Sequence, residues 1–138
     1  MHTHTPHRTP FEQEYLAWYQ RRICNPGVPF DAAALARAVA AQFPTRPLWI
    51  EAAARCTRAW PENELITYFM SWPERKRRWW YVGGFVMDHP TLGTLIVDLV
   101  RDAAAPQGIS IGSIEFLDRV LGRRTSALAF LAMLRRPN

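Results

Sequence analysis

The apolar periodicity of the chain changes at Pro61, and this change is the strongest constraint on the fold. Before Pro61, apolar side chains recur every three or four residues, which is the spacing of helices that bury one face. After it, short runs of aromatic and β-branched residues lie between turn signals, a pattern typical of strands. Because the two patterns are segregated along the chain, we expect an α+β fold. A doubly wound α/β sheet would need a crossover helix between each pair of parallel strands.

About three helices are expected in the N-terminal half. Thr9 to Glu12 reads as a capping box with proline at the first helical position, and the turn signal at 25–27 ends that helix. Asp31 can cap a second helix that runs to Phe43. The apolar spacing of residues 47–60 predicts a third helix.

The C-terminal half predicts an antiparallel meander of three or four strands, with a small half-open barrel as the alternative. The expected strands cover residues 65–72, 79–87, 94–101 and 109–114. Residues 94–101 would also suit a short helix, and we favour a strand. A short helix over 115–121 and a C-terminal helix from Ser126 complete the prediction. Glycines at 83, 84, 108 and 112 within or beside strands suggest bulges.

Length and composition favour one domain. The chain has 138 residues, of which 49% are hydrophobic and 21% charged, so residues 9–138 can form a single core. Residues 1–8 read as a disordered tail. Its histidines His2, His4 and His7 come with no further ligand, so we expect no metal and no cofactor.

The cysteines and the apolar runs indicate the compartment. Cys24 and Cys56 do not form a CxxC pair, and no apolar stretch near the first residue resembles a signal peptide. We therefore expect a cytoplasmic protein. No apolar run reaches the roughly 18 residues of a membrane-spanning helix, so no membrane partner is expected.

No catalytic motif is present. The P-loop, dinucleotide-binding, serine-elbow and zincin patterns are all missing, so we expect a protein that is not an enzyme. A pair formed by His89 and either Cys24 or Cys56 is the remaining route to catalysis. The segment 88–90, Asp-His-Pro, is more simply explained as a turn.

The net charge of +5 is concentrated in one segment. Four consecutive cations, Arg75, Lys76, Arg77 and Arg78, lie between tryptophans where we expect a loop between two strands. The expected binding residues are Trp72, Arg75, Lys76, Arg77, Arg78, Trp79 and Trp80. A secondary basic patch is expected at Arg123 and Arg124. Strand alternation makes it hard to bury Trp79 and Trp80 on the same face.

Two kinds of partner suit such a segment, and an ordinary solvated loop is the simplest alternative. Trp, Tyr and Arg are enriched in protein interface hot spots, whereas guanidinium groups and indoles also bind phosphates and bases. We therefore expect a non-enzymatic, stoichiometric binding or inhibitor protein that occludes an acidic protein or a nucleoprotein complex. Immunity proteins and the anti-CRISPR-like, anti-defence proteins of phages and mobile elements are of this type.

The alternatives are a small nucleic-acid-binding module and, third, an enzyme that uses His89 and a cysteine. On the binding hypothesis, changing Arg75, Arg77 and Arg78 together to alanine weakens binding through the on-rate and leaves stability almost unchanged.

Overall fold

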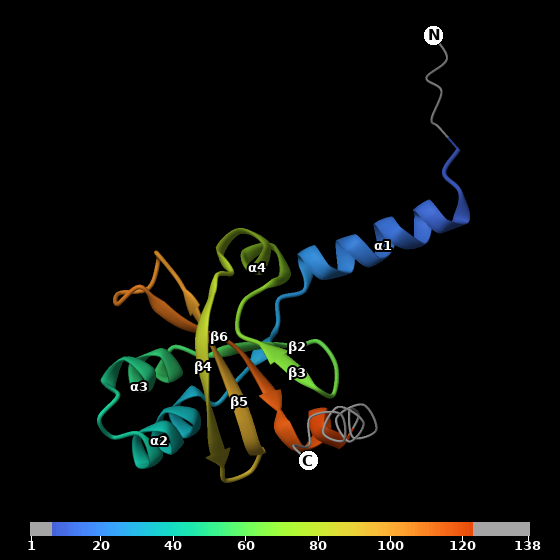
Figure 1. The fold of residues 1–138 in the computed structure, drawn as a ribbon. Helices are drawn as coiled ribbons and strands as arrows, with labels where there is room; N and C mark the ends of the chain where they lie inside the picture. Colours follow the sequence, from blue (N-terminus) through green and yellow to red (C-terminus); the bar gives the residue numbers. More distant parts are fainter. Residues whose placement is uncertain (1–6, 123–138) are drawn as a thin grey trace, which may run out of the picture.

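The computed structural model describes residues 7–122 of the chain (Figure 1). The expected tail is therefore described only at its last two residues. The helix expected from Ser126 and the patch expected at Arg123 and Arg124 lie outside the described residues.

The described chain folds into a mixed structure of helices and one antiparallel sheet. The elements are, in chain order, α1 (Pro10–Cys24), β1 (Val28–Pro29), α2 (Ala32–Gln42), α3 (Pro47–Ala54), β2 (Arg58–Pro61), β3 (Ile66–Tyr68), α4 (Trp72–Arg78), β4 (Tyr81–His89), β5 (Gly93–Arg101) and β6 (Ile109–Phe116). A helical segment at 117–122 follows β6. The six strands have the order β1-β2-β3-β6-β5-β4. The predicted combination of helices with an antiparallel sheet is confirmed, and the segment 94–101 is a strand.

The predicted number of strands was wrong, and so was the half-open barrel. The sheet is open and has six strands, with β1 and β4 at its edges. β4, β5 and β6 form one run of consecutive antiparallel strands, and β1, β2 and β3 form a second run, which joins the first through the pairing of β3 with β6. The additional strands β1 and β2 are two and four residues long, too short to show a period in the sequence.

The third helix ends earlier than its apolar spacing predicted. It stops at Ala54, and Arg58–Pro61 form β2 instead of continuing the helix. Trp60, which matched the helical spacing, is held as part of a strand: its indole N–H donates to the carbonyl of Asn25 at 2.9 Å. Its ring also lies where a side chain on Gly27 would have to be, so a tertiary contact fixes its position.

Helices α2 and α3 cover one face of the sheet (Figure 1). Leu35 and Val39 of α2 are fully buried with Leu95 and Val97 of β5 and Ile114 of β6. Burying a side chain of this size contributes about 1.5–3 kcal/mol, so this layer is the main source of stability.

The opposite face of the sheet carries more polar residues and is where α4 lies. Asp98 of β5 and Ser113 of β6 are register partners on this face, and the Ser113 hydroxyl donates to the Asp98 carboxylate at 2.6 Å. The ladder shifts register there because β6 skips Gly112, and it shifts again between Tyr81 and Gly83. Bulges were predicted at these glycines.

Helix α1 projects from the rest of the fold (Figure 1). Its start at the capping box is confirmed: the Thr9 hydroxyl accepts from the Glu12 N–H, and the Glu12 carboxylate accepts from the Thr9 N–H. None of its residues is buried. Within residues 7–122, no helix combines the length and the apolar character that a membrane crossing requires.

Candidate binding surface around helix α4

The segment that carries the four cations is a helix and not the expected loop. Ser71 caps it by accepting the Glu74 N–H, and Pro73 lies in its first turn, where a missing N–H costs nothing. Glu74 then forms an ion pair with Arg78 one turn later, at 2.8 Å. The first predicted strand accordingly ends at Tyr68 and does not reach Trp72.

The helical period divides the cations into two groups. Arg75 and Arg78, three residues apart, face the body of the protein and are partly buried. Lys76 and Arg77 face solvent, as does Trp80 just beyond the helix. Residues three or four apart share a helix face, and this places the two groups on different sides of α4.

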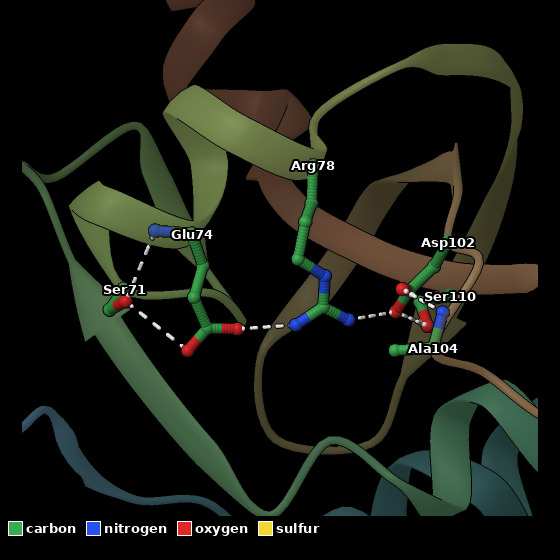
Figure 2. Close-up of polar contacts among 6 residues, drawn as sticks. All are labelled: Ser71, Glu74, Arg78, Asp102, Ala104 and Ser110. Atoms are coloured by element: carbon green, nitrogen blue, oxygen red, sulfur yellow. Dashed lines mark hydrogen bonds and ion pairs between the residues drawn. The ribbon is translucent and has the colours of Figure 1, made fainter.

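Arg78 links α4 to the connection between β5 and β6. Its guanidinium donates to Glu74 through one nitrogen and to Asp102 through the other, at 2.5 Å (Figure 2). Asp102 is almost fully buried and also accepts from the Ser110 hydroxyl and the Ala104 N–H, at 2.8 and 3.0 Å.

The two charges of this pair shift each other's pKa. Burial alone would raise the pKa of Asp102, but the hydrogen bonds from Arg78, Ser110 and Ala104 and the charge of Arg78 lower it below its ordinary value. The hydrogen bond to Asp102 raises the pKa of Arg78. Both groups are therefore ionised at neutral pH.

Arg75 is bound to the sheet. Its guanidinium lies 3.6 Å from the centre of the Tyr68 ring and 3.9 Å from the Glu62 carboxylate, and only 12% of its side chain is exposed. Burial lowers the pKa of Arg75, while Tyr68 and Glu62 oppose that shift. Arg75 and Arg78 thus contribute to the fold and are not available as free cations.

Two of the predicted binding tryptophans also pack against the fold. Trp72 meets the rings of Trp18 and Tyr19 of α1 edge to face, with ring centres 6.1 and 5.2 Å apart. Trp79 packs on Tyr68 and over Gly112, where no Cβ could fit without displacing the indole. The missing side chain at Gly112 therefore makes room for Trp79.

Lys76, Arg77 and Trp80 form the exposed remainder of the predicted site. The Trp80 side chain is 66% exposed, and the Arg101 guanidinium lies 5.7 Å from its ring centre. The Lys76 ammonium lies 4.7 Å from the Trp72 ring. Within the described part of the chain, neither Lys76 nor Arg77 has an ion pair. We call Lys76, Arg77 and Trp80 the α4 surface.

An open groove of about 660 Å³ lies between α4 and the polar face of the sheet. Trp72, Arg75 and Lys76 line it from α4, and Asp98 and Glu115 line it from the strands. Both signs of charge are present, so the groove does not form a uniformly positive channel.

The geometry gives no support to catalysis by His89 and a cysteine. His89 is buried, and its Nδ1 accepts the N–H groups of Thr91 and Leu92 at 3.2 and 3.1 Å, which closes the turn between β4 and β5. Burial lowers the pKa of His89 and raises that of Cys56 to about 12. Cys56 lines a different cavity, next to Arg78. Cys24 is exposed at the end of α1.

Metal ligands do not gather in the part of the chain that the structure describes: no three His, Cys, Asp or Glu side chains there are placed to hold an ion. His2 and His4 lie outside the described residues.

Comparisons with protein-family models, curated proteins and solved structures gave no match.

Sequence reasoning missed that most of the predicted site belongs to the fold. Of its seven residues, Trp72, Arg75, Arg78 and Trp79 contact other elements, and three form the α4 surface. The available signal was the Ser71-x-x-Glu74 capping pattern, which predicts a helix start. Asp102, Tyr68 and Arg101 contact residues of the site only in the folded protein. No sequence pattern near them indicates these contacts.

Proposed function

We propose that this protein is a non-enzymatic binding protein that acts stoichiometrically, with the α4 surface as its contact site. The observation that carries the proposal is the exposure of Trp80, whose ring centre lies 5.7 Å from the Arg101 guanidinium, together with the exposure of Lys76 and Arg77, which lack ion pairs within residues 7–122. A large exposed indole flanked by cations is the composition of an interface hot spot.

The mechanism is occlusion of a partner surface. Trp80 supplies the apolar anchor, and a buried tryptophan removes roughly 150–250 Å² from water. Lys76 and Arg77 attract carboxylates at long range and then pair with them, which raises the association rate. An immunity protein or an anti-defence inhibitor of a phage or mobile element would work in this way.

An acidic protein fits this surface better than nucleic acid does. Glu115 and Asp98 line the groove next to Lys76, and Glu62 lies beside Arg75. These carboxylates would repel a phosphate backbone that followed the groove, whereas a folded acidic partner needs to contact only Trp80 and the outer side of α4. Nucleic-acid binding is therefore the second candidate, supported by the exposed indole on which a base could stack.

The triple alanine variant at Arg75, Arg77 and Arg78 is not a clean test, because two of these residues stabilise the fold. The better variant combines Lys76→Glu, Arg77→Glu and Trp80→Ala, all at exposed positions. A matched control combines Arg8→Glu, Arg37→Glu and Leu48→Ala, which removes the same charge and one exposed apolar side chain elsewhere.

The experiment is affinity capture from a lysate with wild type, variant and control, followed by mass spectrometry. We expect wild type and control to retain a common acidic protein in equimolar amount and the variant to lose it. Equal retention by all three proteins contradicts the proposal.

A fluorescence-anisotropy titration with single- and double-stranded oligonucleotides at low and high salt tests the second candidate. We expect no binding at low salt. Tight, salt-sensitive binding that the triple variant abolishes would establish the nucleic-acid function instead.

A further inference from the structure

The groove between α4 and the sheet has a floor made by three neighbouring strands. Ser113 of β6 is the register partner of both Tyr68 on β3 and Asp98 on β5, so these three side chains form one row on the same face. Four further side chains line the groove from α4, its C-terminal end and the start of β4: Trp72, Lys76, Trp79 and Tyr81. The groove volume of about 660 Å³ lies within the range of small-molecule sites, about 300–1,000 Å³.

Asp98 is buried in this floor with one carboxylate oxygen unpartnered. The residue is only 8% exposed, and it lines the groove. Its Oδ2 accepts from the Ser113 hydroxyl at 2.6 Å, whereas its Oδ1 has no hydrogen bond or ion pair among residues 7–122. Burying a carboxylate is unfavourable unless donors satisfy it, and a cationic donor makes the strongest hydrogen bond. Asp98 therefore offers a strong acceptor to a ligand in the groove.

The distribution of charge favours a ligand whose cation lies on the sheet. Among the described residues, three cations and two carboxylates line the groove: Arg22, Arg75, Lys76, Asp98 and Glu115. Arg22 and Arg75 already lie 2.7 and 3.9 Å from the Glu62 carboxylate. Lys76 belongs to α4, whereas Asp98 and Glu115 belong to the sheet. The strands thus present negative charge to the ligand, and the helix presents positive charge.

Aromatic rings beside the floor can hold the body of such a ligand. The Tyr81 side chain is 58% exposed and lines the groove. Trp79 also lines it and is held edge to face against Tyr68, with ring centres 5.7 Å apart. Aromatic side chains pack against flat apolar groups and attract cations to their faces.

We propose that this groove binds a small organic cation with an aromatic body. Its ammonium or amidinium group donates to Oδ1 of Asp98, and its ring packs against Trp79 and Tyr81. An anion would meet Asp98 as a like charge, and a neutral ring would leave Oδ1 without a donor.

The ligand site goes beyond the function proposed for the α4 surface and does not rest on it. Asp98 is not part of that surface, so a variant at Asp98 leaves Lys76, Arg77 and Trp80 in place. Failure of ligand binding leaves partner capture untouched, and failure of partner capture leaves ligand binding untouched.

The test is isothermal titration calorimetry of the full chain with three aromatic cations at millimolar concentration: tryptamine, phenethylamine and benzamidine. N-acetyltryptamine keeps the body of tryptamine without its charge, and indole-3-propionate carries a negative charge instead. We expect at least one cation to bind with one-to-one stoichiometry and both control compounds to bind at least about tenfold more weakly. Asp98→Asn keeps an acceptor for Ser113 and should weaken binding of the cation at least about tenfold.

Tyr81→Ala tests the same site without changing the buried carboxylate, and it should also weaken binding of the cation. Glu51→Gln on α3 and Tyr15→Ala on α1 are matched controls at exposed positions, and they should leave binding unchanged. Far-UV circular dichroism should show equal helix content in all variants. Failure of all three cations to bind the wild type overturns the proposal. Equal binding by Asp98→Asn or by Tyr81→Ala, or equal affinity for N-acetyltryptamine, overturns it as well.

Discussion

Asp102 fastens the C-terminal end of α4 to the connection between β5 and β6. Replacing it with alanine leaves Arg78 without its buried partner and Ser110 without its acceptor. We expect the free energy of unfolding at neutral pH to fall by about 1.5–3 kcal/mol, the range for hydrogen bonds to a charged group. Urea denaturation measures this change, with Glu51→Ala on α3 as the exposed control.

The contribution of Asp102 depends on pH in a defined direction. Its pKa in the folded protein lies below the ordinary value near 3.8, so its stabilisation is complete above that value and is lost as the pH falls through the folded pKa. The difference between wild type and Asp102→Ala should therefore be constant from neutral pH to about pH 5 and shrink in stronger acid. A difference that grows as the pH falls would contradict this account.

A substitution at Gly112 tests whether the missing side chain there makes room for the Trp79 indole. A Cβ at this position would lie 2.5 Å from the Trp79 ring and 2.8 Å from Val100. We expect Gly112→Ala to cost about 1–3 kcal/mol through overpacking and to change the near-UV circular dichroism of the tryptophans. Gly122→Ala, where the added Cβ meets nothing within 4 Å, is the control.

The helical period of α4 predicts which of its cations stabilise the protein. Arg75→Ala and Arg78→Ala remove contacts to Tyr68 and Asp102, and each should lower the free energy of unfolding by at least about 1 kcal/mol. Lys76→Ala and Arg77→Ala should stay within about 0.5 kcal/mol of wild type, as is usual for exposed positions. Thermal and chemical denaturation of the four variants check this pattern, and four equal effects would be inconsistent with the orientation of α4.

An N-terminal capping pattern precedes both α1 and α4, but we used it to predict only α1. The capping box at Thr9 gave the start of α1 to the residue, and the corresponding pattern at Ser71 marks the start of α4. We expected a loop there because the four adjacent cations lie between two predicted strands. Like charges also repel one another along a helix. That repulsion is offset by carboxylates from distant parts of the chain, Glu62 and Asp102, which no local reading can place.

At the scale of the whole molecule, the combination of helices with an antiparallel sheet could be predicted, and the order of the elements and the assembly of the sheet could not. The segments 94–101 and 109–114 are long enough for their residue patterns to indicate strands, and both are central strands of the sheet. The pairing of β3 with β6 joins residues 45 to 49 positions apart, and the pairing of β1 with β2 joins residues 29 to 31 positions apart. The exposure of α1 likewise follows from tertiary arrangement, because its aromatic spacing equally suits a buried helix.

The residues of the candidate site could be predicted from the sequence, but their roles could not. The residues were identified from composition, and the side of α4 on which each one lies decides whether it packs against the fold or faces solvent. The sequence grouped seven residues, and the fold leaves Lys76, Arg77 and Trp80 available for a partner.

The affinity of the captured partner for wild type and for the Lys76→Glu/Arg77→Glu/Trp80→Ala variant tests the central claim most directly. Isothermal titration calorimetry should show one-to-one binding by the wild type and at least about a hundredfold weaker binding by the variant, equivalent to roughly 2.7 kcal/mol. The melting temperature of the variant should match that of the wild type. Equal affinity of the two proteins would contradict the claim that the α4 surface binds the partner.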